Sequence, residues 1–285
     1  MGIERLFEYI GNTDNRFHGV CITKGGKEIA ALIRSPESRR YPIYSAVKTI
    51  LGMGVGFLVQ EGRMDTEKPL YRYLSDRQRR LIPENRREDF SKLSVERFLT
   101  MTVAGYPFRP QGESGWEEQA LGADIAYAGC NRFEYSNFPA LLVSAAAQNA
   151  AGEDFYLYLC SRLFEPLGID APPYRKTPEG YFYGASGMEL SVRELARIGQ
   201  RLLELSRGGG YFEKAVSPVI NTGKSGYGYF TWADKDYFYI SGKWGQKCIA
   251  FRNSGVIITY LSDRQEGDEE AFRLASDLGN QFLQN

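Results

Sequence analysis

Histidine is almost absent from this chain, since His18 is the only one among 285 residues. Metal sites built from several histidines are therefore excluded, and a Ser-His-Asp triad could be assembled only around His18. His18 precedes Gly19-Val20-Cys21-Ile22, which is typical of the start of a strand. We interpret His18 as a polar residue at a strand edge. A serine nucleophile in this chain would then need a lysine, a tyrosine or a carboxylate as its base.

Net charge is also lacking, because 35 basic residues balance 35 acidic ones. This composition gives no electrostatic footprint for nucleic acid or for an anionic membrane surface, and we expect neither as a partner. A basic cluster at 77–87 is diluted by Asp76, Glu84 and Glu88, so we interpret it as a solvated connector.

Paired cysteines and long apolar runs are missing as well. Cys21, Cys130, Cys160 and Cys248 lack the short spacings of a metal site or redox pair, and we expect reduced, mostly buried thiols. No apolar stretch is long enough to cross a bilayer, and the N-terminus lacks the apolar centre of a signal peptide. A cytoplasmic location is expected if the natural chain starts at Met1.

Strand patterns occur at both ends of the chain, and helical patterns dominate the middle. Expected helices cover 3–10, 47–59, 94–102, 137–151, 155–164, 192–205 and 269–282, and expected strands cover 19–23, 28–34, 227–232, 237–241, 247–251 and 256–261. A long glycine-rich loop is expected at 105–128. We predict an α+β fold, an α/β sandwich in which one antiparallel sheet is assembled from the N- and C-terminal segments and flanked by helices, with a helical lobe inserted. The chain 1–285 would be a single domain, with an α/β lobe of 1–60 plus 222–285 and a helical lobe of 61–221.

Ser45 and Lys48 form the only Ser-x-x-Lys pair in the chain, at the start of the expected helix 47–59. Residues three apart share one helix face, so the Lys48 amine can reach the Ser45 hydroxyl. A neutral lysine beside a serine can activate it as a nucleophile. The alternative is a helix-capping serine followed by a solvated lysine. The glycines at 52, 54 and 56 indicate that the helix is buried and has close neighbours.

Two further motifs could complete a site. Tyr135-x-Asn137 precedes an expected helix. The tyrosine oxygen can relay a proton, and the asparagine amide can hold a substrate carbonyl. The alternative is that Ser136 or Asn137 only caps the helix, which is equally compatible with the motif. Lys-x-Gly occurs three times, at Lys24, Lys224 and Lys243. Only Lys243 is followed by one strand, a turn, a second strand and the terminal helix.

These three motifs, in this order, resemble the signatures of serine β-lactamases and penicillin-binding proteins. The tyrosine of the second motif is similar to that of the class C-like branch, which includes DD-peptidases, esterases and amidases. Further segments resemble the same family over nearly the whole chain: 99–102, 164–168, 187–199 and 242–246.

The resemblance implies a β-lactamase-related serine hydrolase that needs no cofactor and forms an acyl-enzyme on an ester, amide or peptide-like substrate. It implies that Ser45 is the nucleophile, that Lys48 and Tyr135 share acid and base roles, and that Asn137, Lys243, Trp244 and Gly245 contact the substrate. The backbone N–H groups of Ser45 and Gln246 would form the oxyanion hole, with Gln246 on the edge strand of the sheet.

Two departures from the family pattern bear on specificity. Trp244 stands where enzymes that hold a β-lactam carboxylate usually have a small or hydroxylated residue, and Val47 replaces a frequent hydroxyl residue before the lysine. Both departures favour an ester or amide substrate over a β-lactam antibiotic. A true β-lactamase or DD-peptidase, a penicillin-binding sensor without turnover, and Lys224 as the third-motif lysine all remain alternatives. The sequence does not indicate the oligomeric state.

Overall fold

An eight-stranded antiparallel sheet forms the centre of the computed structural model, which describes residues 2–34, 36, 38–126 and 128–282. The strand order is β2-β1-β10-β9-β8-β7-β6-β5. The strands are β1 Phe17–Lys24, β2 Lys27–Ile33, β5 Ile220–Asn221, β6 Gly226–Tyr227, β7 Trp232–Ala233, β8 Tyr237–Gly242, β9 Gln246–Phe251 and β10 Val256–Ser262. A separate pair joins β3 Tyr41–Pro42 to β4 Glu189–Leu190.

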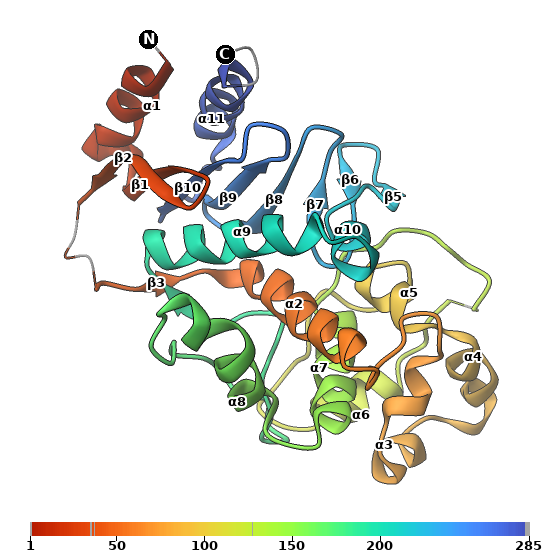
Figure 1. Cartoon of the computed structure of the whole chain (residues 1–285). Coiled ribbons are helices and arrows are strands. Elements are labelled where there is room, and N and C mark those ends of the chain that lie inside the picture. Colours follow the sequence, from red (N-terminus) through yellow and green to blue (C-terminus); the bar gives the residue numbers. More distant parts are fainter. Residues whose placement is uncertain (1, 35, 37, 127, 283–285) are drawn as a thin grey trace.

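Helices cover both faces of this sheet and build the rest of the molecule. They are α1 Gly2–Gly11, α2 Val47–Gln60, α3 Asp76–Arg80, α4 Arg87–Lys92, α5 Val95–Leu99, α6 Trp116–Leu121, α7 Phe138–Ala151, α8 Phe155–Leu159, α9 Val192–Ser206, α10 Gly210–Ala215 and α11 Glu269–Gln281. Figure 1 shows α1 and α11 together on one face of the sheet and α9 on the other, with α2, α7 and α8 beyond α9.

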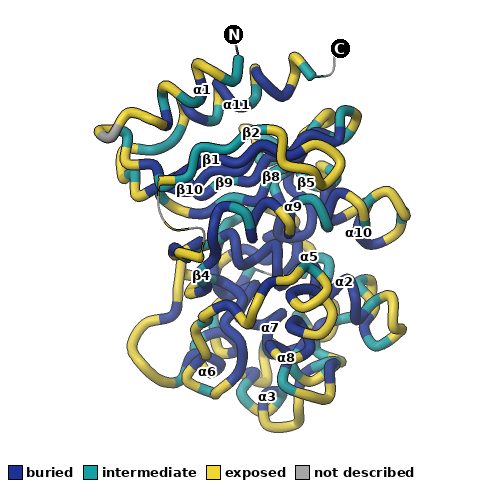
Figure 2. Tube along the Cα trace, turned by 60° about the vertical axis from the view of Figure 1, so that its left-hand side comes forward, coloured by how far each residue is buried: buried dark blue, intermediate teal, exposed yellow. Residues whose placement is uncertain are grey.

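The central strands consist of nearly continuous apolar residues because helices cover both faces of the sheet. All seven residues of β10 are buried, because α1 and α11 cover one face of the sheet and α9 covers the other (Figure 2). Leu6 and Leu274 of the two covering helices pack with Ile258 of β10 in one apolar cluster. On the other face, a Cβ added to Gly199 of α9 would lie 2.2 Å from the Cys248 sulfur, so α9 packs directly on β9.

The predicted fold class is confirmed. The N-terminal strand β1 pairs with the C-terminal strand β10 in antiparallel register, from Phe17 opposite Ser262 to Lys24 opposite Val256. The glycines of α2 also behave as expected, since a Cβ at Gly54 would meet the ring of Phe155 at 2.6 Å. The division of the chain into two lobes stays a prediction.

The single strand expected at 227–232 is wrong, because it is split into β6 and β7 around a turn. The backbone N–H of Tyr229 donates to Ala215 O at 3.0 Å, and that of Phe230 donates to Leu99 O at 2.9 Å. These bonds connect the segment to α10 and α5 instead of to a neighbouring strand. Phe230 also has a φ of 53°, which no regular strand allows.

Several helical segments differ from expectation. The helix expected at 94–102 is the shorter α5, and the one expected at 155–164 is α8 followed by a π-helical turn at Cys160–Phe164. The expected connector at 77–87 contains most of α3, and Arg77 pairs with the buried carboxylate of Glu117. The expected loop at 105–128 contains α6, and its residue 127 lies outside the described residues. Propensity missed α3, α4, α6 and α10 because each is only five or six residues long and depends on tertiary packing.

His18 is not at the edge of the sheet, because β1 lies between β2 and β10. The residue sits where the pairing of β1 with β10 shifts register, between Phe17 and Gly19. Its ring stacks on Tyr41 with centroids 3.7 Å apart, and its Nε2 lies 3.2 Å from the Asp263 carboxylate. In the described part of the chain, no helix has the length and apolar character that a membrane span requires.

Candidate active site

Ser45 lies in a short 3-10 turn, Tyr44–Ala46, that leads directly into α2. Its side chain is partly exposed. The turn is anchored by the backbone N–H of Ile43, which donates to Met188 O at 3.0 Å. Ala46, and not Ser45, occupies the N-cap position of α2, and no side chain caps it. The capping alternative for Ser45 is therefore wrong, and its hydroxyl is available for other partners.

Lys48 is the second residue of α2 and is fully buried, so the alternative of a solvated lysine is also wrong. Its Nζ lies 3.1 Å from Ser45 Oγ, 2.7 Å from Asn137 Oδ1 and 3.0 Å from the backbone O of Ala185. All three partners are uncharged. Burial without a carboxylate partner lowers the pKa of Lys48 from 10.5 to about 7.

The three partners of Lys48 match the valences of a neutral amine. A neutral amine has two N–H donors and one lone pair. Asn137 Oδ1 and Ala185 O can only accept, so they take the two donors. The protonated amine donates to Ser45 Oγ as well, whereas the neutral amine leaves its lone pair for the Ser45 hydroxyl. This arrangement aims the Ser45 proton at Lys48 Nζ, which is the geometry that a general base requires.

Tyr135 completes the surroundings of Ser45 from the segment before α7. Its ring centroid lies 5.0 Å from Lys48 Nζ, and Ser45 is close enough to its phenol to lower the pKa of that group. Burial raises the pKa of Tyr135 to about 12, although the effect of Ser45 partly offsets this. Tyr135 is therefore protonated at neutral pH, while a substantial fraction of Lys48 is neutral and can accept a proton. The ring is held in place by Trp232, which stacks on it with centroids 6.2 Å apart.

Asn137 is free to serve the site because its neighbour performs the capping. Ser136 Oγ accepts from the N–H of Phe138 at 3.1 Å and donates to Pro107 O at 2.6 Å. Asn137 makes no side-chain cap bond, and its amide oxygen is bound to Lys48 instead. Asn137 is also close enough to the phenol of Tyr183 to lower the pKa of that group, against the larger effect of burial.

The third motif lies in the turn between β8 and β9, next to the segment that carries Ser45. The ring of Trp244 meets the ring of Tyr44 edge to face at 5.0 Å, and Lys243 Nζ lies 4.4 Å from the Trp244 ring centroid. Lys243 is exposed, and within the described structure no hydrogen bond joins it to Ser45 or Tyr135. Gly245 has a φ of 80°, as the tight turn requires.

Gln246 does not lie on an edge strand, because β9 is between β8 and β10. Its buried side chain is occupied by the turn: Nε2 donates to Lys243 O at 3.1 Å and to Ser262 O at 2.5 Å. The open edge near Ser45 belongs instead to the end of β8, since β7 pairs only as far as Tyr239. There the backbone approaches closely, and a Cβ on Gly242 would lie 2.2 Å from Ile43 O.

Lys224 lies away from this cluster. It is exposed between β5 and β6, at the far end of the strand order, and no described contact connects it with Ser45. His18, likewise, contacts Tyr41 and Asp263 but not Ser45 in the described structure.

Sequence reasoning missed Ala185, Tyr183 and Tyr44. Ala185 contributes only a backbone carbonyl, which no side-chain pattern can indicate. Tyr183 is one of 19 tyrosines, and burial raises its pKa to about 12, against the opposing charge of Arg175. Tyr44 has a φ of 47° directly before Ser45, a conformation that an aromatic residue rarely adopts and that local propensity cannot predict.

The described residues contain no group of three or more histidine, cysteine or acidic side chains placed to hold a metal ion. Ser45 itself lies beside the buried amine of Lys48, and the ring of Tyr135 packs over that amine.

The chain belongs to the beta-lactamase family, which matches residues 11–279. Its fold is similar to that of a protein described as a 6-aminohexanoate-dimer hydrolase from Bacillus anthracis, with a TM-score of 0.75, 15% identity, and coverage of 99% of this chain and 82% of that one. FmtA from Staphylococcus aureus gives a TM-score of 0.75 at 11% identity, covering 97% and 88% of the two chains. A D-stereospecific amidohydrolase from Streptomyces sp. gives 0.71 at 16% identity, covering 95% and 97%. No curated protein matches the sequence.

Proposed function

We propose that the protein is a serine acyl hydrolase that cleaves a small ester, amide or peptide-like substrate through a covalent acyl-enzyme. The observation that carries this proposal is the set of three uncharged partners around the buried Lys48 amine, one of which is Ser45 Oγ at 3.1 Å. A lysine with a pKa of about 7 is a usable base at neutral pH.

In the proposed acylation step, Ser45 Oγ attacks the substrate carbonyl carbon while Lys48 Nζ takes the hydroxyl proton. The oxyanion would be held by the backbone N–H groups of Ser45 and Gln246, a contribution of about 3 kcal/mol by precedent. The Tyr135 hydroxyl donates a proton to the leaving alcohol or amine. The proton held on Lys48 then restores Tyr135, so that the acyl-enzyme forms with no net change in protons.

In the proposed deacylation step, a water molecule attacks the acyl carbonyl and gives up a proton to the Lys48 and Tyr135 pair. Ser45 leaves as the alcohol and regains a proton, and the free acid is released. Asn137, Lys243, Trp244 and Gly245 would orient the substrate during both steps.

The neighbours in fold support an amide substrate, since two are named as a 6-aminohexanoate-dimer hydrolase and a D-stereospecific amidohydrolase. Trp244 also favours an ester or amide substrate over a β-lactam. It brings an indole next to Tyr44 at the end of β8, where a hydroxyl donor would serve a β-lactam carboxylate.

Incubation with p-nitrophenyl acetate, followed by intact-mass analysis and by p-nitrophenol release, tests the proposal. We expect one transient acetyl group and steady turnover in the unmodified protein, and neither in Ser45→Ala, with an unchanged melting temperature because Ser45 is partly exposed. Ser91→Ala, an exposed serine on α4, is the matched control and should behave as the unmodified protein. Turnover by a well-folded Ser45→Ala variant would refute the proposal, and an acyl group that never leaves would identify a sensor.

A further inference from the structure

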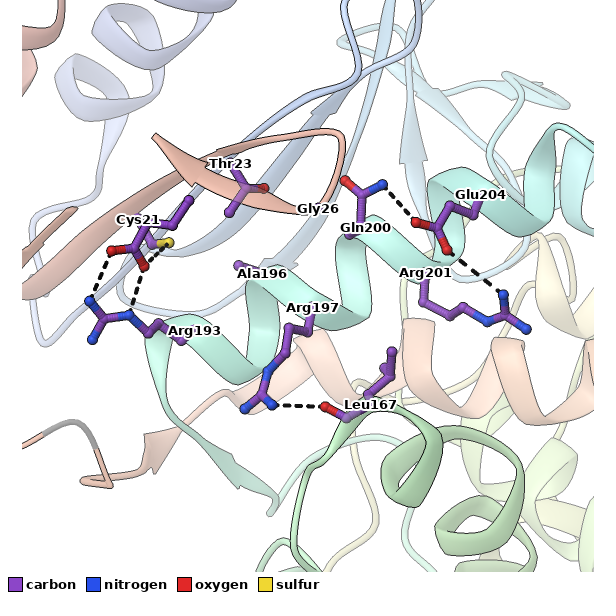
Figure 3. Close-up of a pocket in the computed structure, with 11 residues that line it drawn as sticks. Cys21, Thr23, Gly26, Leu167, Arg193, Ala196, Arg197, Gln200, Arg201 and Glu204 are labelled. Atoms are coloured by element: carbon purple, nitrogen blue, oxygen red, sulfur yellow. Dashed lines mark hydrogen bonds and ion pairs between the residues drawn. The ribbon is translucent and has the colours of Figure 1, made fainter. Parts of the chain in front are cut away.

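A cavity of about 430 Å³ lies outside the Ser45 cluster, between the β1–β2 hairpin and the outer face of α9. Figure 3 shows the hairpin on one side of α9 and the turn at Leu167 on the other, with the side chains of α9 between them. No residue that lines the cavity takes part in the contacts around Ser45 and Lys48. Its volume falls in the range of small-molecule pockets. We refer to it as the α9 cavity.

Two polar atoms in the α9 cavity are buried without a partner in the described structure. They are Thr23 Oγ1, on a side chain that is 8% exposed, and Gln200 Oε1. The Gln200 amide is oriented by its Nε2, which donates to Glu204 Oε1 at 2.9 Å, so the carbonyl oxygen is the atom left over. An unpaired buried polar atom costs about 1–3 kcal/mol. A ligand that supplies hydrogen bonds here would remove that cost.

The same cavity carries a positive charge without a carboxylate to balance it. Arg193, Arg197 and Arg201 follow one another at four-residue spacing on α9. Arg193 pairs with Glu28 at 2.7 Å, and Arg201 lies 3.7 Å from Glu204.

Arg197, between them, donates Nη1 to the carbonyl oxygens of Leu167 and Gly168 at 2.8 and 3.0 Å. No carboxylate of the described residues pairs with it. The two carbonyls hold the guanidinium in position and leave its other N–H groups for an anion.

We propose that the α9 cavity binds a small organic acid that also carries a hydroxyl or amide N–H group. The carboxylate pairs with Arg197, and the donor group bonds Gln200 Oε1 and Thr23 Oγ1. The apolar body of the ligand lies on Leu167 and Ala196 between these two ends. The donor separates this ligand class from simple fatty or aromatic acids, because Gln200 Oε1 can only accept.

Titrations followed by NMR with three probes test this inference. Mandelate has the carboxylate, the hydroxyl and an apolar ring, phenylacetate lacks the hydroxyl, and mandelamide lacks the charge. We expect saturable binding of mandelate, with phenylacetate and mandelamide each at least about tenfold weaker, since a hydrogen bond to a charged or buried group is worth about 1.5 kcal/mol or more. Equal affinity for all three probes, or no saturable binding of mandelate, would overturn the proposal.

Substitutions then assign the binding to the α9 cavity. Arg197→Gln and Thr23→Val should each weaken mandelate binding about tenfold, while Arg207→Gln, at the exposed end of the same helix, should not change it. Thr23→Val should also raise the melting temperature of the free protein, because it removes an unpaired buried hydroxyl without changing shape. Unchanged mandelate affinity in both cavity variants, or a destabilised Thr23→Val, would contradict the assignment.

Discussion

The burial that makes Lys48 a usable base also lowers the stability of the protein. Replacing Lys48 tests this link between its pKa and the free energy of unfolding. Its amine is fully buried, and burial lowers its pKa from 10.5 to about 7. In the unfolded chain the same amine is solvated and keeps its ordinary pKa. Between these two values the unfolded state binds more protons than the folded state, so the stability of the protein should rise as the pH rises from about 7 to 10.5.

The size of the effect follows from the pKa difference. At about 1.4 kcal/mol per pH unit, the lowered pKa costs roughly 5 kcal/mol of folding free energy below pH 7, and the cost fades to less than about 1 kcal/mol at pH 10. Lys48→Met has a side chain of similar length and no amine. It leaves Asn137 Oδ1 and Ala185 O without their donor, which costs a few kcal/mol at every pH. The pH dependence of the difference between the two proteins therefore isolates the amine.

Urea unfolding of both proteins between pH 6 and pH 10 measures that difference. We expect the free energy of unfolding of Lys48→Met, taken relative to that of the unmodified protein, to fall by about 4 kcal/mol between pH 6 and pH 10. Every other titrating group is common to both proteins and cancels to a first approximation. Acylation of the unmodified protein should rise about tenfold per pH unit below 7 and level off above it, and Lys48→Met should not acylate. A stability difference that does not change with pH would refute a neutral Lys48, and with it the proposed base.

Three further outcomes are expected. Lys243→Ala should lower kcat/KM for the ester by tenfold or more, whereas Lys224→Ala should leave it unchanged; equal effects would contradict the choice of Lys243. The unmodified protein should hydrolyse a chromogenic cephalosporin far more slowly than the ester, and Trp244→Asn should shift the kcat/KM ratio toward the cephalosporin; rapid hydrolysis of several β-lactams would show that Trp244 lies outside the recognition surface. Iodoacetamide should label the native protein first at Cys130, because Cys248 is buried and burial raises the pKa of its thiol to about 12; a Cys130→Ser variant that is labelled as fast would contradict this.

The sequence predicts the strands well where they are deeply buried. It predicts them poorly where the backbone bonds to groups outside the sheet instead of to a neighbouring strand. The strands β8, β9 and β10 each have several consecutive buried or alternating residues, and the patterns at 237–241, 247–251 and 256–261 identify them within a residue or two. The segment 227–232 has the same aromatic composition. It turns because its backbone finds acceptors on Ala215 and Leu99, which lie far away along the chain and carry no local signal.

The sequence likewise predicts some features of the candidate site and not others. Ser45, Lys48, Tyr135 and Asn137 are connected by described contacts, and the sequence could indicate them because each contributes a side-chain function at a motif spacing. The sequence could not show that Lys48 has no acidic partner, which depends on what packs around it from α7 and from Ala185. Burial, which no neighbouring carboxylate offsets, lowers the pKa of the lysine, and the motif spacing does not reveal it.

Two of the five described non-glycine residues with a positive φ lie side by side near Ser45. Tyr44 and Trp244 have φ values of 47° and 63°, and their rings contact each other beside Ser45. A bulky residue in this conformation costs about 1–3 kcal/mol, so the surrounding structure must enforce both. For Trp244 it does so through the Ser262 hydroxyl, which donates to Trp244 O at 2.5 Å, and through the close approach of Gly242 to Ile43 O. A threonine at 244 would be a poor way to supply a hydroxyl here, because a β-branched side chain tolerates this φ badly, whereas asparagine adopts it readily. The aromatic contact and the strained turn are thus one feature, and a change of specificity at this position must first satisfy the backbone.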